Sequence, residues 1–281
     1  HENVGYTLGI AKVLNNLGIF SDIGGDWAKA VDYYNQAYHL FQNTGDLQFQ
    51  SMALDNMGTL AMATGKHKIA RKQLENSRSI VQQLGDSWGI AGCEVNLAHL
   101  ALIEERFVDS ARHAETALAL SDKIGSSENQ IQARWILALI LAEAGELEKG
   151  LEMAQEALNM TRQTGLAEKE SECLRALGML HRRGDRLTDA ERWLQQSVEL
   201  ASAQSDPYRH GLALLELGRL YQTLAQTDYG NRASWRSKAE TALSKAHQQF
   251  STLGAAHDLG LTQLALNENN ALPVHGAIDD Q

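Results

Sequence analysis

The chain has 281 residues, 43% of them hydrophobic, and carries a formal net charge of −10 at pH 7. The hydrophobic content excludes a chain that is disordered by composition. The acidic balance argues against non-specific binding to nucleic acid or to anionic membranes, because both need a basic surface. No run of 18 apolar residues is present, and residues 1–20 lack the pattern of a signal peptide. We therefore expect a cytoplasmic protein without a membrane span.

A period of 40 residues governs the spacing of small residues along the chain. Glycine recurs at this interval as Gly45, Gly85, Gly125 and Gly165. A second series in another phase reads Gly18, Gly58, Ala98, Ala138, Gly178 and Gly218. Self-similarity at a fixed period is the signature of a stacked repeat array. A chain of this length therefore need not divide into two ordinary compact domains, because an array grows by adding repeats.

Each repeat is predicted to contain two helices, because its apolar residues recur at helical spacing and only two prolines interrupt the chain. The first helices are expected at 6–23, 46–63, 86–103, 126–143, 166–183 and 206–225. The second helices are expected at 27–43, 67–83, 107–123, 147–163, 187–203 and 235–252. Residues that can cap the N-terminus of a first helix follow the repeat boundaries: Asp46, Asp86, Ser126 and Asp206.

The repeats divide the chain as follows. Residues 1–5 are a lead-in, and six repeats span 6–45, 46–85, 86–125, 126–165, 166–205 and 206–254. The phase slips by nine residues in the sixth repeat, which predicts an insert at 226–234 between its two helices. Residues 255–268 are predicted to form an unpaired helix that covers the apolar face of the last pair. Residues 269–281 are polar and read as a tail or linker.

Two cysteines, Cys93 and Cys173, occupy the same position in repeats three and five. Other repeats have alanine there, as at Ala53 and Ala133. Equivalent positions two repeats apart are too distant for the short Cα separation of a disulfide. We therefore predict two reduced, buried thiols, which fits a reducing compartment.

The repeats resemble the tetratricopeptide repeat, which has a Leu-Gly pair in its first helix and small residues in its second. The first-helix pattern appears as LNNLG at 14–18, LDNMG at 54–58, LRALG at 174–178 and LLELG at 214–218. The second-helix small positions read Ala30, Ala70, Ser110, Gly150 and Ala190. The chain departs from the family in its 40-residue period, in lacking a proline at the end of each repeat, and in having Glu94 and Arg134 where the first leucine is expected.

This resemblance covers residues 6–254 and implies an all-α, right-handed solenoid of six helix pairs plus a capping helix. Forty-residue versions are similar to the arrays of bacterial multidomain signalling ATPases, of maltose-activator-type regulators and of kinesin light chain. The resemblance implies a non-catalytic module for protein–protein interaction, whose first helices line a concave groove. Such a module is expected to belong to a larger signalling or regulatory protein, and the sequence favours the bacterial group.

Three asparagines share one position on the predicted groove: Asn16, Asn56 and Asn96. In similar arrays an asparagine there hydrogen-bonds the backbone of an extended peptide, because an amide both donates and accepts. The alternative is that these amides brace adjacent repeats or face water. If they bind peptide, neutral hydrogen bonds contribute about 0.5–1.5 kcal/mol each.

The fourth repeat presents an apolar groove face instead, with Gln132, Trp135 and Leu139. Trp135 is a candidate anchor, since aromatic side chains dominate interface energetics; alternatively it packs against a neighbouring helix. His99 shares the groove stripe with Asn96 and reads as a polar lining residue. Together these side chains would also suit a sugar, so a small-ligand sensor is an alternative function.

The last two repeats carry a group of arginines at groove positions: Arg175, Arg182, Arg183 and Arg219. Arginine favours bidentate contacts with carboxylates, so this end could receive an acidic segment of a partner. The alternative is that these charges pair with Glu172 or Glu216. The predicted groove thus runs from an asparagine ladder through an apolar centre to an arginine-rich end.

Motifs for catalysis or for metal and cofactor binding are absent from the sequence. No HExxH or CxxC spacing, no phosphate-binding glycine loop and no nucleophile–base pair is present. We expect neither an enzyme nor a cofactor or metal, and a protein or peptide partner in place of nucleic acid. Self-association is a further possible use of the array.

Overall fold

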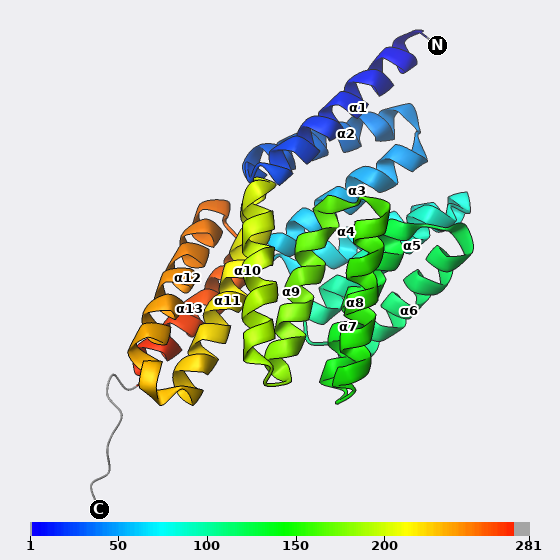
Figure 1. The fold of residues 1–281 in the computed structure, drawn as a ribbon. Helices are drawn as coiled ribbons and strands as arrows, with labels where there is room; N and C mark the ends of the chain where they lie inside the picture. Colours follow the sequence, from blue (N-terminus) through cyan, green and yellow to red (C-terminus); the bar gives the residue numbers. More distant parts are fainter. Residues whose placement is uncertain (1, 273–281) are drawn as a thin grey trace, which may run out of the picture. The chain divides into compact units, whose positions relative to one another are not determined.

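The computed structural model describes residues 2–272, and within them the chain consists of helices without strands (Figure 1). The first helices of the pairs are α1 (Glu2–Ile23), α3 (Leu47–Ala63), α5 (Ser87–Ile103), α7 (Ser127–Glu143), α9 (Ala167–Arg183) and α11 (Pro207–Thr227). The second helices are α2 (Trp27–Thr44), α4 (His67–Leu84), α6 (Phe107–Ile124), α8 (Leu147–Thr164), α10 (Leu187–Ala203) and α12 (Arg232–Leu253). A short 3-10 helix, η1 (Tyr229–Asn231), precedes α12, and α13 (Ala256–Ala271) follows it. The predicted all-α repeat fold is confirmed.

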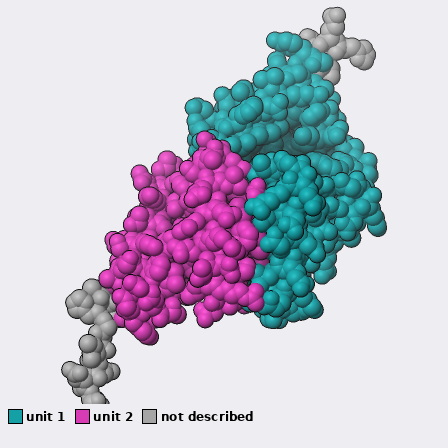
Figure 2. All heavy atoms as spheres, viewed as in Figure 1, with its two compact units in different colours: residues 1–169 teal, residues 170–281 magenta. Residues whose placement is uncertain are grey.

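The chain forms two compact units, residues 1–169 and residues 170–281, here called the N-terminal and C-terminal units (Figure 2). The helix ends follow the predicted turn chemistry in both. The boundary glycines Gly45, Gly85, Gly125 and Gly165 all have positive φ, from 66° to 72°, which a residue without Cβ adopts at no steric cost. Asp46, Asp86 and Asp206 accept hydrogen bonds from backbone N–H groups of the following turn. Ser126 makes no such side-chain bond, so the cap predicted there is wrong.

Helix pairs and close packing of first helices build the N-terminal unit. The first helices α3, α5 and α7 each contact the second helix of their own pair and the second helix of the pair before it, as α3 contacts α4 and α2. Successive first helices also touch, α1 with α3, α3 with α5 and α5 with α7. The glycine of the Leu-Gly pair permits close packing within a pair: a Cβ on Gly58 of α3 would lie 2.7 Å from the side chain of Leu74 of α4. The first helices therefore form one layer of the unit.

Within the C-terminal unit α11 is the central helix. It packs against α10, α12 and α13. Gly178 of α9 fits against Leu194 of α10, as Gly58 fits against Leu74. The final helix α13 is tied to α11 by a hydrogen bond from Gln222 Nε2 to the Ala265 carbonyl oxygen, 2.6 Å long. The capping helix thus lies against the first helix of the last pair.

Several boundaries differ from the sequence-based expectation. Residues 2–5, expected as a lead-in, are part of α1. Most of the predicted insert 226–234 is helical, because α11 extends to Thr227 and α12 begins at Arg232. Trp235 closes this turn by donating its indole N–H to Asp228, 3.0 Å away. The capping helix continues to Ala271, and residues 273–281 of the predicted tail lie outside the described residues. Cys93 and Cys173 are buried thiols that form no disulfide, as predicted.

Candidate functional site

Two of the three asparagines predicted to line the groove, Asn56 and Asn96, make hydrogen bonds between repeats. Asn56 Nδ2 donates to Asn15 Oδ1 at 3.2 Å, and Asn96 Nδ2 donates to both carboxylate oxygens of Asp55 at 2.9 and 3.0 Å. Each bond joins a first helix to the first helix of the preceding repeat. Asn16 is exposed, while Asn56 and Asn96 are half-buried. The structure thus favours the bracing role over peptide binding for Asn56 and Asn96.

Asp55 lies at the centre of this bracing. Burial raises the pKa of Asp55 to about 6, although hydrogen bonds from Asn96 and Cys93 oppose the rise. The Cys93 thiol sits 3.3 Å from Ser77 Oγ, and burial together with the Asp55 charge raises the pKa of this thiol to about 12. A thiol that stays protonated is a poor nucleophile. Cys93 is therefore a packing residue of the repeat interface.

The predicted apolar centre on α7 is not an exposed surface. Trp135 is only 2% exposed and meets the His99 ring edge-on, with ring centroids 5.1 Å apart. Gln132 and Leu139 are half-buried. This burial accords with the packing alternative for Trp135 and leaves almost none of its ring exposed to act as the predicted ligand anchor. A sugar cannot stack on a ring whose faces are covered by neighbouring helices.

The arginines of the C-terminal unit gather around a buried carboxylate. Glu216 is 4% exposed and accepts from Arg182 Nη2 at 3.1 Å and from Arg219 Nη1 at 2.7 Å. Burial alone would raise the pKa of Glu216, but Arg219, Arg182 and Arg175 together hold it below its usual range. Arg183 is exposed on the same helix as Arg182. Glu172, the other predicted partner, instead pairs with Arg209.

A pocket of about 440 Å³ opens beside this cluster in the C-terminal unit. Its lining comes from α9, α11 and the C-terminal end of α13: Arg182, Arg219, Gln222, Thr223, Gln226, Glu268 and Leu272. The sequence pattern points to the two arginines but not to the amides, the hydroxyl, or the residues at and after the end of α13. Gln222 and Thr223 stand one helical turn beyond Arg219, so the helical period was the signal that could have added them.

Each pocket arginine keeps most of its hydrogen-bonding capacity. A guanidinium carries five N–H donors, and the bond to Glu216 takes one from Arg182 and one from Arg219. Both side chains are about 30% exposed, so solvent reaches them. Glu216 holds the two guanidinium groups side by side, and each group has further N–H donors that do not bond Glu216. This arrangement can receive an anionic group such as a carboxylate.

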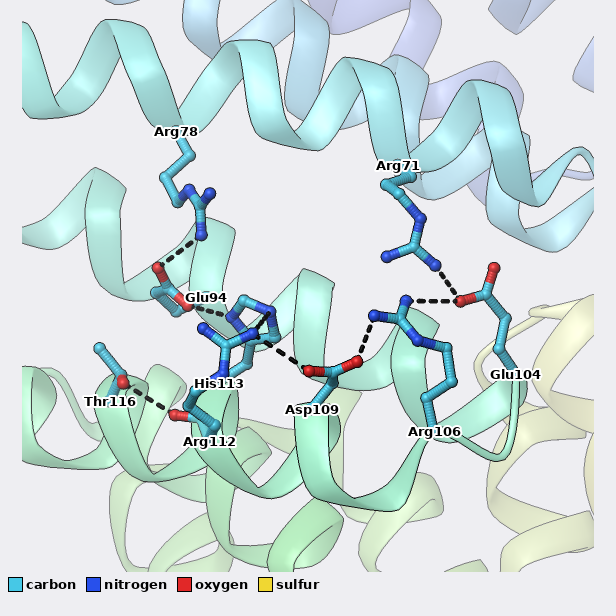
Figure 3. Close-up of polar contacts among 9 residues, drawn as sticks. All are labelled: Arg71, Arg78, Glu94, Glu104, Arg106, Asp109, Arg112, His113 and Thr116. Atoms are coloured by element: carbon cyan, nitrogen blue, oxygen red, sulfur yellow. Dashed lines mark hydrogen bonds and ion pairs between the residues drawn. The ribbon is translucent and has the colours of Figure 1, made fainter.

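A second charged cluster lies in the N-terminal unit (Figure 3). Of its members, only Glu94 stands out in the sequence. Glu94 replaces the first leucine of its repeat and is 6% exposed. Its carboxylate lies 2.5 Å from His113 Nδ1 and 3.2 Å from Arg78 Nη1. Burial would raise the pKa of Glu94, but His113 and Arg78 lower it below the usual range. The remaining pairs join Arg71 with Glu104, Glu104 with Arg106, Arg106 with Asp109 and Asp109 with Arg112.

Figure 3 shows how this cluster joins three helices: the two arginines Arg71 and Arg78 reach from α4 toward acids and a histidine on and beside α5 and α6. Every arginine drawn makes an ion pair with a carboxylate, and the four arginines share three carboxylates. The cluster therefore stabilises the stacking of two repeats. A carboxylate in place of the consensus leucine was the sequence signal for it.

No group of three or more His, Cys, Asp and Glu side chains that could hold a metal ion occurs among residues 2–272. In the same part of the chain, no helix combines the length and the apolar character needed to cross a membrane. The pocket at Arg182 and Arg219 is therefore the site whose chemistry we pursue.

Comparison with known families identifies the repeats. Residues 129–203 match the model described as "Tetratricopeptide repeat". No curated protein matches the chain by sequence. The matched segment contains α8, α9 and α10 and most of α7, so the match covers two of the helix pairs described above.

Solved structures with the same fold include regulators bound to peptides. NprR in complex with its cognate peptide NprX aligns with a TM-score of 0.66 at 15% identity, over 91% of this chain and 72% of that chain. A Rap protein complexed with Competence and Sporulation Factor aligns with a TM-score of 0.64 at 11% identity, over 92% and 74%. A signal transduction ATPase with a tetratricopeptide repeat sensor, from Pyrococcus horikoshii, gives 0.57 at 16% identity, over 92% and 42%. At these identities the likeness establishes a shared fold.

Proposed function

We propose that this chain, an array with the tetratricopeptide repeat fold, binds a segment of a protein partner without catalysing a reaction. The observation that carries the proposal is the pocket beside Arg182 and Arg219 on the first helices of the C-terminal unit. In this proposal the pocket receives a carboxylate of the partner, either an acidic side chain or a chain terminus.

The chemistry of the pocket suits such a group. The two arginines supply charged donors in a rigid fork, and Gln226 and Thr223 supply neutral polar groups beside them. Glu268 is the one acid among the lining residues, and together with the buried Glu216 it balances the two arginine charges. An incoming carboxylate would therefore be recognised by the N–H donors of the arginines that do not bond Glu216. A hydrogen bond to a charged group contributes about 1.5–3 kcal/mol, which corresponds to roughly ten- to hundredfold in Kd.

Proteins of the same fold support a peptide as the ligand. NprR is in complex with a cognate peptide, and a Rap conjugation gene regulator is in complex with the Phr* peptide. The fold is thus compatible with peptide binding, and the pocket adds a place for charge recognition. A regulatory role within a larger, cytoplasmic protein follows as part of the same proposal.

A selection of random 12-residue peptides displayed on phage tests the proposal, with the wild-type chain, Arg219→Ala and Arg183→Ala as baits. We expect peptides selected on the wild type to be enriched in Asp and Glu. Their Kd, measured by fluorescence anisotropy, should rise at least tenfold with Arg219→Ala. Arg183→Ala is the matched control, because Arg183 is exposed nearby and does not line the pocket.

Arg219→Lys separates charge from geometry. It retains a cation beside Glu216 but loses the planar fork, so we expect a folded protein with intermediate affinity. Selected peptides without acidic residues, or equal binding to Arg219→Ala and wild type, would exclude the pocket as the recognition site. A thermal shift with small carboxylic acids alone, and no selected peptide, would instead favour the small-ligand sensor.

A further inference from the structure

Helix α1 carries an apolar stripe that no part of the described chain covers. Its members recur every three or four residues and lie on one side of the helix: Tyr6, Ile10, Val13, Leu17 and Phe20. Their exposed fractions range from 39% for Ile10 to 74% for Tyr6. Continuous apolar surface of this kind marks an interaction site in a folded protein.

The repeat register shows what normally covers this stripe. Forty residues after Val13 and Phe20 stand Ala53 and Leu60 of α3, which are 0% and 2% exposed. In α5 the corresponding residues, Cys93, Leu97 and Leu100, are equally buried. The positions of Val13 and Phe20 are thus exposed in α1 and buried in both first helices that follow it.

The covering element is the second helix of the preceding pair. Phe41 of α2 packs with Ala53 of α3 in one apolar cluster, and Leu74 of α4 packs with Leu97 and Leu100 of α5 in another. Helix α1 contacts α2 and α3, and Ala11, on a different side of α1 from the stripe, is fully buried. The stripe therefore lies where α3 and α5 pack against the second helix of the preceding pair.

The backbone beside the stripe is open as well. Gly5 and Gly9 lie within α1, and an ideal Cβ on either would meet no atom within 4 Å. Gly5 also has the repeat phase of Gly45, which ends α2 just before α3 begins. Small residues at a helix crossing allow the axes to approach closely.

We propose that this stripe is the docking face for one further α-helix of the second-helix type, seated on α1 as α2 is seated on α3. The partner helix would carry a small and a large apolar residue at the contact, as α2 does with Ala37 and Phe41, which cluster with Ala53 of α3. Val13 and Phe20 are larger than Ala53 and Leu60 of the internal interface. The partner helix therefore has smaller side chains opposite them than an average second helix has. This inference is independent of the arginine pocket.

Adding such a helix to the full chain tests the proposal. A copy of residues 26–45, which contain α2 with its cap and boundary glycine, is placed directly before Tyr6 in place of residues 1–5. This fusion keeps the repeat register, because Gly45 of the copy takes the place of Gly5. If the added helix docks, the Tm rises by about 5 °C or more, since newly buried apolar surface stabilises the folded state.

Stripe variants identify the docking face. Combined Val13→Glu and Phe20→Glu should leave the Tm of the unfused chain nearly unchanged, because both side chains are exposed there, and should abolish the gain of the fusion. Val108→Glu is the control: Val108 is 85% exposed on α6, so the fusion should keep its gain.

Three results would overturn the proposal. The fusion could give no rise in Tm, or a rise that survives the stripe substitutions. Light scattering could also show that the unfused chain is a dimer that Val13→Glu and Phe20→Glu dissociate. In that last case a second copy of the chain, and not a further helix, is the occupant of the stripe.

Discussion

The first helices α3 and α5 and the first helices α9 and α11 carry polar side chains on the same predicted groove face, but these side chains have different roles. In the N-terminal unit Asn56 and Asn96 donate to Asn15 and Asp55, so their amides join neighbouring first helices. In the C-terminal unit Arg182 and Arg219 share one buried acid and still line a pocket. The comparison teaches that repeat position selects the face, whereas the neighbouring helix decides whether a polar group is available to a ligand.

The largest effect is expected from removing Glu216, the acid that holds the two pocket arginines together. Glu216→Leu deletes a carboxylate that is 4% exposed and leaves Arg182 and Arg219 without their shared partner. We expect a loss of about 3 kcal/mol in the free energy of unfolding, the cost of breaking a buried ion pair. Urea denaturation measures it. Glu199→Leu, at an exposed position of α10, should change little by comparison.

The Glu216 contribution also depends on pH. Because its pKa is lowered in the folded state, the stabilisation is present above the ordinary pKa of 4.5 and is lost as the pH falls through the folded value. The difference in stability between wild type and Glu216→Leu should therefore shrink on acidification. A difference that stays constant from pH 7 to pH 3 would show that the loss comes from packing alone.

The contribution of Asp55 to stability should depend on pH with the opposite sign and should be smaller than that of Glu216. Its pKa is raised to about 6 from 3.8, so its contribution favours folding fully below pH 3.8 and is lost as the pH rises through about 6. Asp55→Asn reproduces the neutral Asn15–Asn56 pair found one repeat earlier. We expect it to stabilise the protein by about 2 kcal/mol at pH 7 and by little at pH 4.

Urea denaturation of Asp55→Asn at pH 4, 5, 6 and 7 checks this expectation. The exposed Asp32→Asn serves as a control that should leave the pH dependence unchanged. A gain that is the same at all four pH values would contradict a titrating Asp55.

The smallest expected effect distinguishes bracing from binding along the asparagine ladder. Asn96→Ala removes the amide nitrogen that bonds both oxygens of the Asp55 carboxylate and should cost about 1 kcal/mol in the free energy of unfolding. Asn16→Ala is the matched variant at the same repeat position, and we expect no measurable cost because Asn16 is exposed. Equal losses in the two variants would contradict the bracing role.

Much of the fold followed from spacing along the chain. The 40-residue period located the helix pairs, and the boundary glycines located the turns, because positive φ at a helix end is a local demand. Burial of Cys93 and Cys173 also followed from their alanine-equivalent positions. The helical content of 226–234 did not, since a slip in phase tells where residues were added and not what they form.

The candidate site was only half predictable. The arginines stood out because they interrupt an acidic chain, but Glu268 and Leu272 reach the pocket from α13, far along the sequence. Tryptophan is a residue type that often anchors a binding partner, but Trp135 is buried in the fold, where it packs against the ring of His99.

The sequence by itself determined that this protein is a stack of helix pairs, because helix formation, capping and the small-residue crossings depend on residues close along the chain or one repeat away. Only the tertiary structure decided which polar side chains are bound to a neighbour and which face a pocket. That outcome depends on the identity of the residue across the helix interface, as with Asp55 opposite Asn96 and Glu216 between Arg182 and Arg219. The tertiary structure also decided that the stripe of α1 is exposed, because exposure depends on where the neighbouring helices lie.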